Sequence, residues 1–365
     1  MTTRIVLGGL FLSTVAFWPN VANAQRSQQP TAPTSKTYTT ELILANTTLQ
    51  APMKVIGLVG EVFAVEREGK AIVAIRPDGT RRPLGGVVAG RRQLLYPFDL
   101  ASDGKGALFV LDSSGLVGFT VGGESLGDFP VSGARSLAVK AASEIVFNHP
   151  HNDTLLSEYS SKGEPVRTFG TQLRLSDVSP PSDIAAERLP AFERGLNWAY
   201  LAASDNDSIL VAFRHTPEVR KYNSKGVLLW KVRPQAAFIA AIQDQYWHPT
   251  RTVLIPRLGN VDGYFQTFSG IAADPVSGMA YVLSGDSRIL AVDKNGHWQS
   301  TYTDERLLSP TPTTRGFGRV SAISFFEGRA HIVARDNVYR LTLGETPLLP
   351  EGTKPRQSKS KQERR

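Results

Sequence analysis

The residues best suited to chemistry are histidines and aspartates that cluster in predicted loops. His149 and His151 lie two residues apart, and Asp153 follows two residues later. His215 and His248 occupy later loops. Imidazole and carboxylate groups that converge on one site can hold a transition metal or a calcium ion. No H-E-x-x-H or equivalent spacing accompanies them, so a divalent metal ion and an ordinary solvated loop both stay open.

A second candidate for chemistry is the segment Gly123–Gly127, which matches the G-x-S-x-G pattern around a nucleophilic serine. That pattern works only where a strand turns sharply into a helix beside an oxyanion hole. Gly123 instead falls where the other repeats of the chain have a hairpin glycine, so we expect Ser125 in an outer strand. The sequence contains no glycine loop of the phosphate-binding or dinucleotide-binding kind. We therefore assign no catalytic residue.

The elements that would position these side chains repeat along the chain. A hydrophobic strand, a glycine turn and a short strand recur six times, with turn glycines at Gly79, Gly123, Gly163, Gly226, Gly296 and Gly344. Glycine in these turns allows the positive φ that tight hairpins need. The first two intervals and the last are close to the roughly 40–50 residues of a propeller blade. The two longer intervals are expected to hold insertions at 171–195 and 233–268.

Two of the repeats share a more detailed order of residues. One reads Pro97–Asp103, Gly106–Asp112 and Leu116–Phe119, and the other reads Ser269–Asp274, Gly278–Leu283 and Arg288–Val292. A P-x-D/G-I-A-x-D strand, a G-x-L-Y-V-x-D strand, a short strand and a glycine turn resemble the NHL-type repeat, within the TolB-like propeller superfamily. The resemblance implies an all-β fold with six four-stranded blades.

The last repeat contains three strands, whereas a blade needs four. The strand predicted at Thr40–Ala45 has no hairpin partner, so we expect it to pair against Val338–Leu343 and complete that blade. A strand from the opposite end of the chain removes the free sheet edges of an open ring. The predicted fold is therefore a six-bladed β-propeller over residues 39–345, closed by an N-terminal strand. A β-sandwich with as many strands would not explain the period.

The two ends of the chain differ from the body in composition. Arg4, the apolar run Ile5–Trp18 and the A-x-A site before Gln25 predict a signal peptide over residues 1–24, cleaved between Ala24 and Gln25. Export to the periplasm or the extracellular space follows. Residues 25–38 are rich in Pro, Ser, Thr and Gln and are predicted to be a flexible linker. Residues 346–365 are predicted to be a basic, disordered tail.

The composition of the mature chain limits its partners and its stabilising interactions. The chain has no cysteine, so the predicted fold must be held by its core rather than by disulfides. No later segment approaches the roughly 18 consecutive apolar residues of a membrane helix. The net charge is +8, but residues 351–365 hold six basic and two acidic residues, about half of the excess. Export and this confinement of charge argue against nucleic-acid binding.

Topology predicts which of these residues share a face. In a four-stranded antiparallel blade, the loop after the second strand and the connection to the next blade emerge on the same side. Both insertions should therefore rise beside the histidine-bearing loops. We predict that a ligand or partner contacts this face, at His149, His151, Asp153, His215, Tyr246, Trp247 and His248. Loops that merely cover the core are the alternative.

Rigid repeat scaffolds with long loops on one face are well suited to binding other molecules. We therefore predict an exported, monomeric, non-catalytic recognition or scaffold propeller that binds a protein, a peptide or a glycan. A metal-assisted hydrolase, lactonase or lyase with its site at the propeller mouth is the alternative. The identity of the cofactor, if there is one, stays unknown at this point, with a divalent metal ion as the candidate.

Overall fold

The computed structural model describes residues 34–44, 49, 52–66, 70–85, 94–248, 252–255, 259–262, 266–303, 320–334 and 337–343. The predicted signal peptide, the predicted basic tail, Gly344 and most of the predicted linker lie outside the described residues. Among the described residues, no helix has the length and apolar character that crossing a membrane requires.

Four sheets of four antiparallel strands follow one another along the chain. The first contains β2 (Pro52–Leu58), β3 (Glu61–Glu66), β4 (Ala71–Ile75) and β5 (Arg81–Gly85). The second contains β6 (Pro97–Ser102), β7 (Ala107–Asp112), β8 (Gly115–Thr120) and β9 (Ser125–Phe129). The third contains β10 (Ser136–Val139), β11 (Ile145–Asn148), β12 (Leu156–Tyr159) and β13 (Pro165–Phe169). The fourth contains β14 (Ala199–Ala203), β15 (Ile209–Phe213), β16 (Val219–Tyr222) and β17 (Leu228–Val232).

The remaining large sheet has eight strands in the order β20-β21-β22-β23-β1-β26-β25-β24. Its strands are β1 (Thr34–Leu44), β20 (Phe268–Ala273), β21 (Ala280–Ser284), β22 (Ile289–Val292), β23 (Trp298–Thr303), β24 (Val320–Phe326), β25 (Arg329–Ala334) and β26 (Asn337–Leu343). The predicted pairing of the N-terminal strand with the last strand is confirmed, because β1 pairs antiparallel with β26. The first part of β1 also pairs parallel with β23. The strand begins at Thr34, earlier than the predicted start of structure at Thr39.

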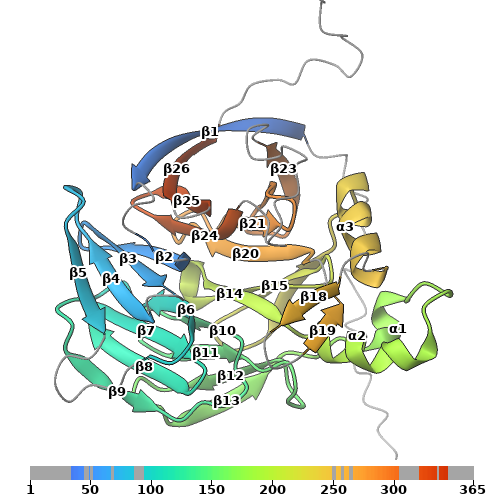
Figure 1. Ribbon diagram of the computed structural model, residues 1–365, viewed down its shortest axis with the longest axis horizontal. Coiled ribbons are helices and arrows are strands. Elements are labelled where there is room, and N and C mark those ends of the chain that lie inside the picture. The colour runs from blue at the N-terminus through green and yellow to red at the C-terminus, as the bar shows by residue number, and fades with distance from the viewer. Residues whose placement is uncertain are drawn as a thin grey trace, which may run out of the picture. The chain divides into compact units, whose positions relative to one another are not determined.

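Six strands surround a common centre, namely the first strands of the four four-stranded sheets and the two end strands of the eight-stranded sheet (Figure 1). In order, β2, β6, β10, β14, β20 and β24 each contact the next, and β24 contacts β2. The fold is therefore all-β and propeller-like. It differs from the expectation of six separate sheets, because β1 pairs on both of its edges and joins the last two sets of strands into one sheet.

The predicted glycine turns are present in the described sheets. Gly79, Gly123, Gly163, Gly226 and Gly296 have φ values between 79° and 90°. A residue with a Cβ atom rarely adopts this conformation, whereas glycine adopts it without strain.

Three of these glycines have a second role between sheets. A Cβ atom on Gly163 would lie 2.2 Å from the ring of Phe129. The corresponding distances are 2.8 Å from Gly226 to the ring of Phe169 and 2.9 Å from Gly296 to the ring of Trp230. In each case an aromatic residue on the last strand of one sheet packs against the turn glycine of the next.

The core lies between neighbouring sheets. Phe63 and Ile72 of the first sheet are fully buried against Leu108 and Val117 of the second. Burial of this kind contributes about 25 cal/mol for each Å² of apolar surface removed from water. Because each sheet depends on its neighbours for burial, closure of the ring stabilises every sheet.

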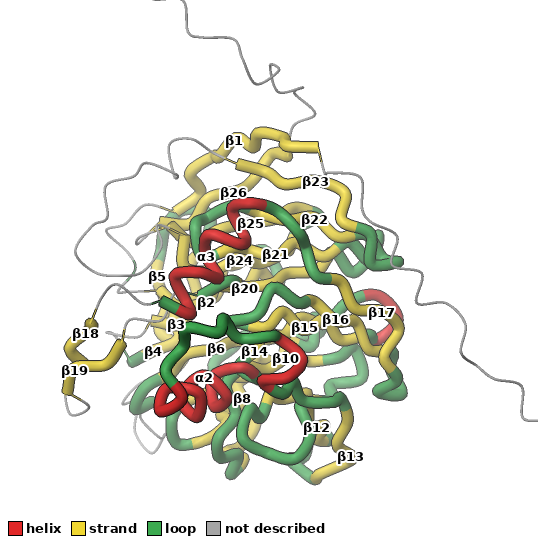
Figure 2. Tube along the Cα trace, turned by 90° about the vertical axis from the view of Figure 1, so that its right-hand side faces the viewer, coloured by secondary structure: helices red, strands yellow, loops and turns green. Residues whose placement is uncertain are grey.

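The two long insertions carry most of the helices. The first holds α1 (Leu175–Val178), the 3-10 helix η2 (Ala186–Arg188) and α2 (Leu189–Leu196). The second holds α3 (Ala237–Trp247), β18 (Thr252–Ile255) and β19 (Gly259–Asp262). Figures 1 and 2 show the helices of both insertions on the same side of the sheets.

The role of β1 can be tested with two substitutions on that strand. Tyr38 is 3% exposed and packs with Leu283 and Leu341, whereas Leu42 is 53% exposed. Tyr38→Ala is expected to lower the free energy of unfolding by about 3–5 kcal/mol, as other buried aromatic truncations do. Leu42→Ala is the matched control and should change it by less than about 0.5 kcal/mol. Equal effects in chemical denaturation would contradict closure through β1.

Candidate functional site

The described contacts bring the two insertions together with the β15–β16 loop. His215, in that loop, stacks on Tyr246 of α3 with ring centroids 4.7 Å apart and the planes inclined by 13°. Tyr246 packs against Phe192 of α2 at 5.2 Å, and its hydroxyl donates a hydrogen bond to the Phe192 carbonyl oxygen at 3.3 Å. We call the surface formed by the loops 149–155 and 214–218 and the insertion segments 171–195 and 233–248 the loop face.

The aromatic residues at this junction form a buried cluster. Phe192, His215, Tyr246 and Trp247 are each no more than 5% exposed. The Trp247 ring lies 4.9 Å from the Phe192 ring and 5.0 Å from the Tyr246 ring. The sequence predicts ligand or partner contact at Tyr246 and Trp247, but both side chains are buried, because α3 turns them toward the first insertion. These residues support the loop face from beneath.

The candidate residues in the histidine-bearing loop of the third sheet differ in burial. His149 is 4% exposed and its ring lies edge-on to Phe147 at 6.0 Å. Burial lowers the pKa of His149, and the Ser132 backbone partly opposes this change. His151 and Asp153 are exposed. The His149 imidazole is thus buried, while the other two side chains face solvent.

The remaining predicted site residue lies at the end of α3. The His248 imidazole is half-buried, with its Nε2 atom 3.8 Å from a carboxylate oxygen of Asp183 and 3.8 Å from one of Asp244. Within the described part of the chain, no group of three or more histidine, aspartate or glutamate side chains is arranged to hold a metal ion.

A residue that the sequence analysis did not select organises this region. Asn148, at the end of β11, is fully buried. Its Nδ2 atom donates to the Asn197 carbonyl oxygen at 3.0 Å, and its Oδ1 atom accepts from the Ala199 backbone N–H at 3.0 Å. The third and fourth sheets are therefore joined at the loop face by one side chain. Its position beside His149 in the polar loop was the only signal available in the sequence.

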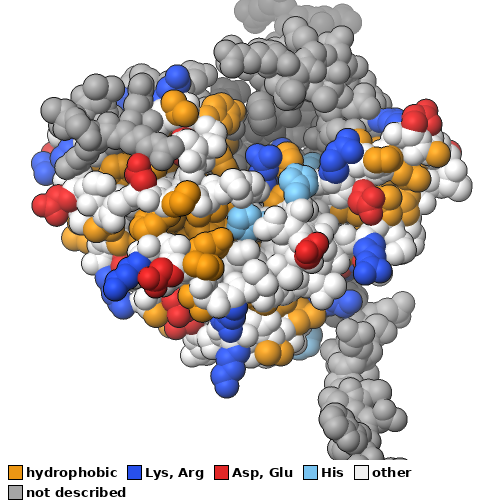
Figure 3. All heavy atoms as spheres, turned by 90° about the horizontal axis from the view of Figure 1, so that it is seen from below, with side chains coloured by type: hydrophobic (Ala, Val, Ile, Leu, Met, Phe, Trp, Pro, Cys, Tyr) orange, Lys and Arg blue, Asp and Glu red, His pale blue; other side chains and the backbone are white. Residues whose placement is uncertain are grey.

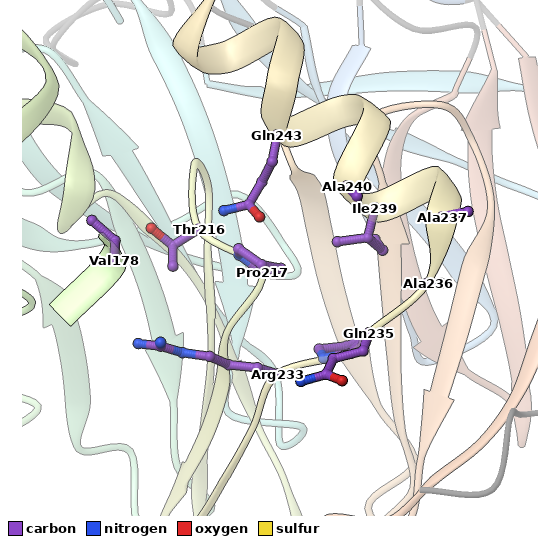
Figure 4. Close-up of a pocket in the computed structure, with 11 residues that line it drawn as sticks. Val178, Thr216, Pro217, Arg233, Gln235, Ala236, Ala237, Ile239, Ala240 and Gln243 are labelled. Carbon is purple, nitrogen blue, oxygen red and sulfur yellow. The ribbon is translucent and has the colours of Figure 1, made fainter. Parts of the chain in front are cut away.

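The loop face also contains a cavity of about 460 Å³ (Figure 4). Its lining comes from both insertions and the β15–β16 loop, and comprises Val178, Thr216, Pro217, Arg233, Pro234, Gln235, Ala236, Ala237, Ile239, Ala240 and Gln243. Figure 4 shows the Gln243 side chain reaching from α3 toward Thr216 and Pro217.

The charge of the one arginine in the cavity wall is compensated. The Arg233 guanidinium pairs with Glu218, and its Nη1 atom donates to the Asp177 carbonyl oxygen at 3.0 Å. Hydroxyl and amide groups on Thr216, Gln235 and Gln243 remain as the polar groups among apolar walls. Such a cavity can recognise a ligand through hydrogen bonds and apolar contact.

Comparison with known proteins identifies the fold. No protein-family model matches this sequence, and no curated protein matches it. A solved structure of streptogramin B lyase is 10% identical, with a TM-score of 0.53, over 84% of this chain and 98% of that chain. A structure of a protein of unknown function from Bacteroides thetaiotaomicron is 11% identical, with a TM-score of 0.52, over 85% and 77%. At these identities the likeness shows a propeller-like fold and carries no information about activity.

Truncation of a side chain in the buried aromatic cluster should destabilise the fold. Trp247→Ala is expected to lower the free energy of unfolding by about 3–5 kcal/mol, because it leaves a cavity among packed rings. Gln245→Ala, at an exposed position of the same helix, is the matched control and should have little effect. Thermal and chemical denaturation provide the measurement, and wild-type stability in Trp247→Ala would show that the cluster does not support the fold.

Proposed function

We propose that the protein is an exported recognition propeller that binds a peptide, a protein or a glycan on its loop face. The observation that carries the proposal is the cavity whose walls come from three chain segments, namely α1, the β15–β16 loop and the start of the second insertion. The buried aromatic cluster beneath these segments supports a preformed site. A rigid site loses less conformational entropy when a ligand binds.

The chemistry of the cavity wall favours recognition. Its hydroxyl and amide groups can donate and accept hydrogen bonds, and its apolar side chains offer contact area. Peptides and glycans present matching amide and hydroxyl groups. Figure 3 shows acidic and basic side chains interspersed on one face, whereas binding to a phosphate backbone uses a basic stripe, so we propose no nucleic-acid partner.

The proposal includes a six-bladed, NHL-like ring that functions as a monomer. Support for six blades comes from the six first strands, which contact one another in a closed cycle. On this interpretation, β20–β23 form one blade, and β24–β26 form the next blade together with the second part of β1. The pairing of β1 with β23 then connects two blades.

Export is the part of the proposal that is simplest to test. Cleavage between Ala24 and Gln25 is expected in the native host, because an apolar run and an A-x-A site precede Gln25. Mass spectrometry of the protein from the periplasmic or extracellular fraction should show an N-terminus at Gln25. An intact Met1 in that fraction would contradict it.

Recognition can be tested by filling the cavity. Ala240 is exposed and lines the cavity, so Ala240→Phe should block it without disturbing the core. Val276, in the β20–β21 turn, is 91% exposed and provides the matched control Val276→Phe at the opposite ends of the strands. We expect Ala240→Phe to weaken binding at least about tenfold, or 1.4 kcal/mol, with unchanged melting.

The measurement uses the immobilised mature protein with the secreted fraction of the host and a glycan array, followed by calorimetry on the ligand that is identified. The control variant should bind that ligand as the wild type does. Full retention of the ligand by Ala240→Phe, or the failure of wild-type protein to bind any peptide, protein or glycan, would overturn the proposal.

A further inference from the structure

Two arginines and a tryptophan meet where the first strands of the third and fourth sheets begin. Arg135 precedes β10, Trp198 precedes β14, and Arg214 follows β15. The guanidinium carbons of Arg135 and Arg214 lie 4.9 Å and 5.0 Å from the centroid of the Trp198 ring. Both cations therefore contact one aromatic ring, and Arg214 belongs to the loop face.

The backbone around these three residues is held by hydrogen bonds. The carbonyl oxygen of Asn148 accepts from the Arg135 N–H at 2.9 Å, and the carbonyl oxygen of Trp198 accepts from the Arg214 N–H at 2.7 Å. The side chain of Asn148 bonds to the backbone on both sides of Trp198. The two arginines are thus presented from a rigid frame that spans two sheets.

The positive charge at this place is not compensated within the described residues. Burial lowers the pKa of Arg135, and repulsion from Arg214 adds to the effect. Neither arginine forms an ion pair with a carboxylate among the residues that the structure describes. Two like charges near one ring repel each other, and contact with the ring offsets part of this cost without neutralising either charge.

The carboxylate of Asp99, on the second sheet, has partners other than the two arginines. Asp99 on β6 accepts from the Ser136 hydroxyl at 2.6 Å and the Leu137 backbone N–H at 2.9 Å, and it lies 3.3 Å from the Lys54 ammonium. These contacts connect β2, β6 and β10 along the centre of the ring. Asp99 therefore bonds to residues of these strands rather than to Arg135 or Arg214.

We propose that Arg135, Trp198 and Arg214 form a binding site for one oxyanion group, a carboxylate, sulfate or phosphate, of an anionic ligand. A planar guanidinium can donate two parallel hydrogen bonds to such a group, and the ligand charge would relieve the repulsion between the arginines. The inference rests on the proposed function and adds the charge of the ligand to it. Arg135 is exposed, so the site is accessible from solvent.

The test titrates small anions into the purified mature protein at constant ionic strength. Galacturonate, citrate, sulfate and inorganic phosphate separate the three oxyanion chemistries in calorimetry. At least one should bind saturably to the wild type, with a dissociation constant at least tenfold higher in Arg135→Gln and in Arg214→Gln. Arg329→Gln, an exposed arginine at the start of β25 and outside the loop face, is the matched control and should bind as the wild type does.

A merely structural role predicts different behaviour. If the arginines serve binding, Arg135→Gln should melt at or above the wild-type temperature without ligand, because it removes a repulsion. Arg135→Lys keeps the charge without the planar fork, so its affinity should lie between those of the wild type and Arg135→Gln. A lower melting temperature of Arg135→Gln with undiminished anion binding would overturn the proposal.

Two further outcomes would overturn it. One is the absence of saturable binding of all four anions to the wild type, and the other is equal binding by the wild type and both glutamine variants. The cavity is tested separately, since Ala240→Phe should leave anion binding intact. Failure of the oxyanion site and failure of the cavity to bind a partner are therefore distinguishable.

Discussion

The double pairing of β1 is the constraint on which the rest of the structure depends. One part of this strand pairs parallel with β23, and the other pairs antiparallel with β26. The two ends of the described chain are thereby joined in one sheet. Without β1, β23 and β26 would each present an unpaired edge, which exposes backbone groups and invites association with other chains. The closed cycle of first strands also keeps every sheet packed between two neighbours.

Three contacts between neighbouring sheets have the same form. An aromatic ring on the last strand covers the turn glycine of the next sheet at Phe129–Gly163, Phe169–Gly226 and Trp230–Gly296. These glycines satisfy two requirements at once, a positive φ and a close approach to a ring. A substitution there is therefore expected to strain the turn and to displace the neighbouring sheet, effects that overpacked sites commonly show.

The residues that support the loop face differ from the residues proposed to contact a ligand. His215, Tyr246 and Trp247 are buried and fix the two insertions against each other, so their aromatic character serves packing. The groups that we propose contact a ligand are those of the cavity wall and of the Arg135–Trp198–Arg214 site. This division fits a rigid recognition surface, because contact groups held by packed neighbours need little reorganisation when a ligand binds.

The sequence alone determined the local features of this protein. The glycine turns could be predicted because positive φ is a property of single residues, and the partner of the N-terminal strand could be predicted because one repeat lacked a strand. The second pairing of β1, the burial of Trp247 and the meeting of Arg135 with Arg214 were decided by the tertiary structure. Each depends on which segments, distant in sequence, pack together, and neither composition nor periodicity specifies that. The period of a strand predicts which side chains share a face of the sheet. Ring closure and the insertions decide which residues those side chains contact.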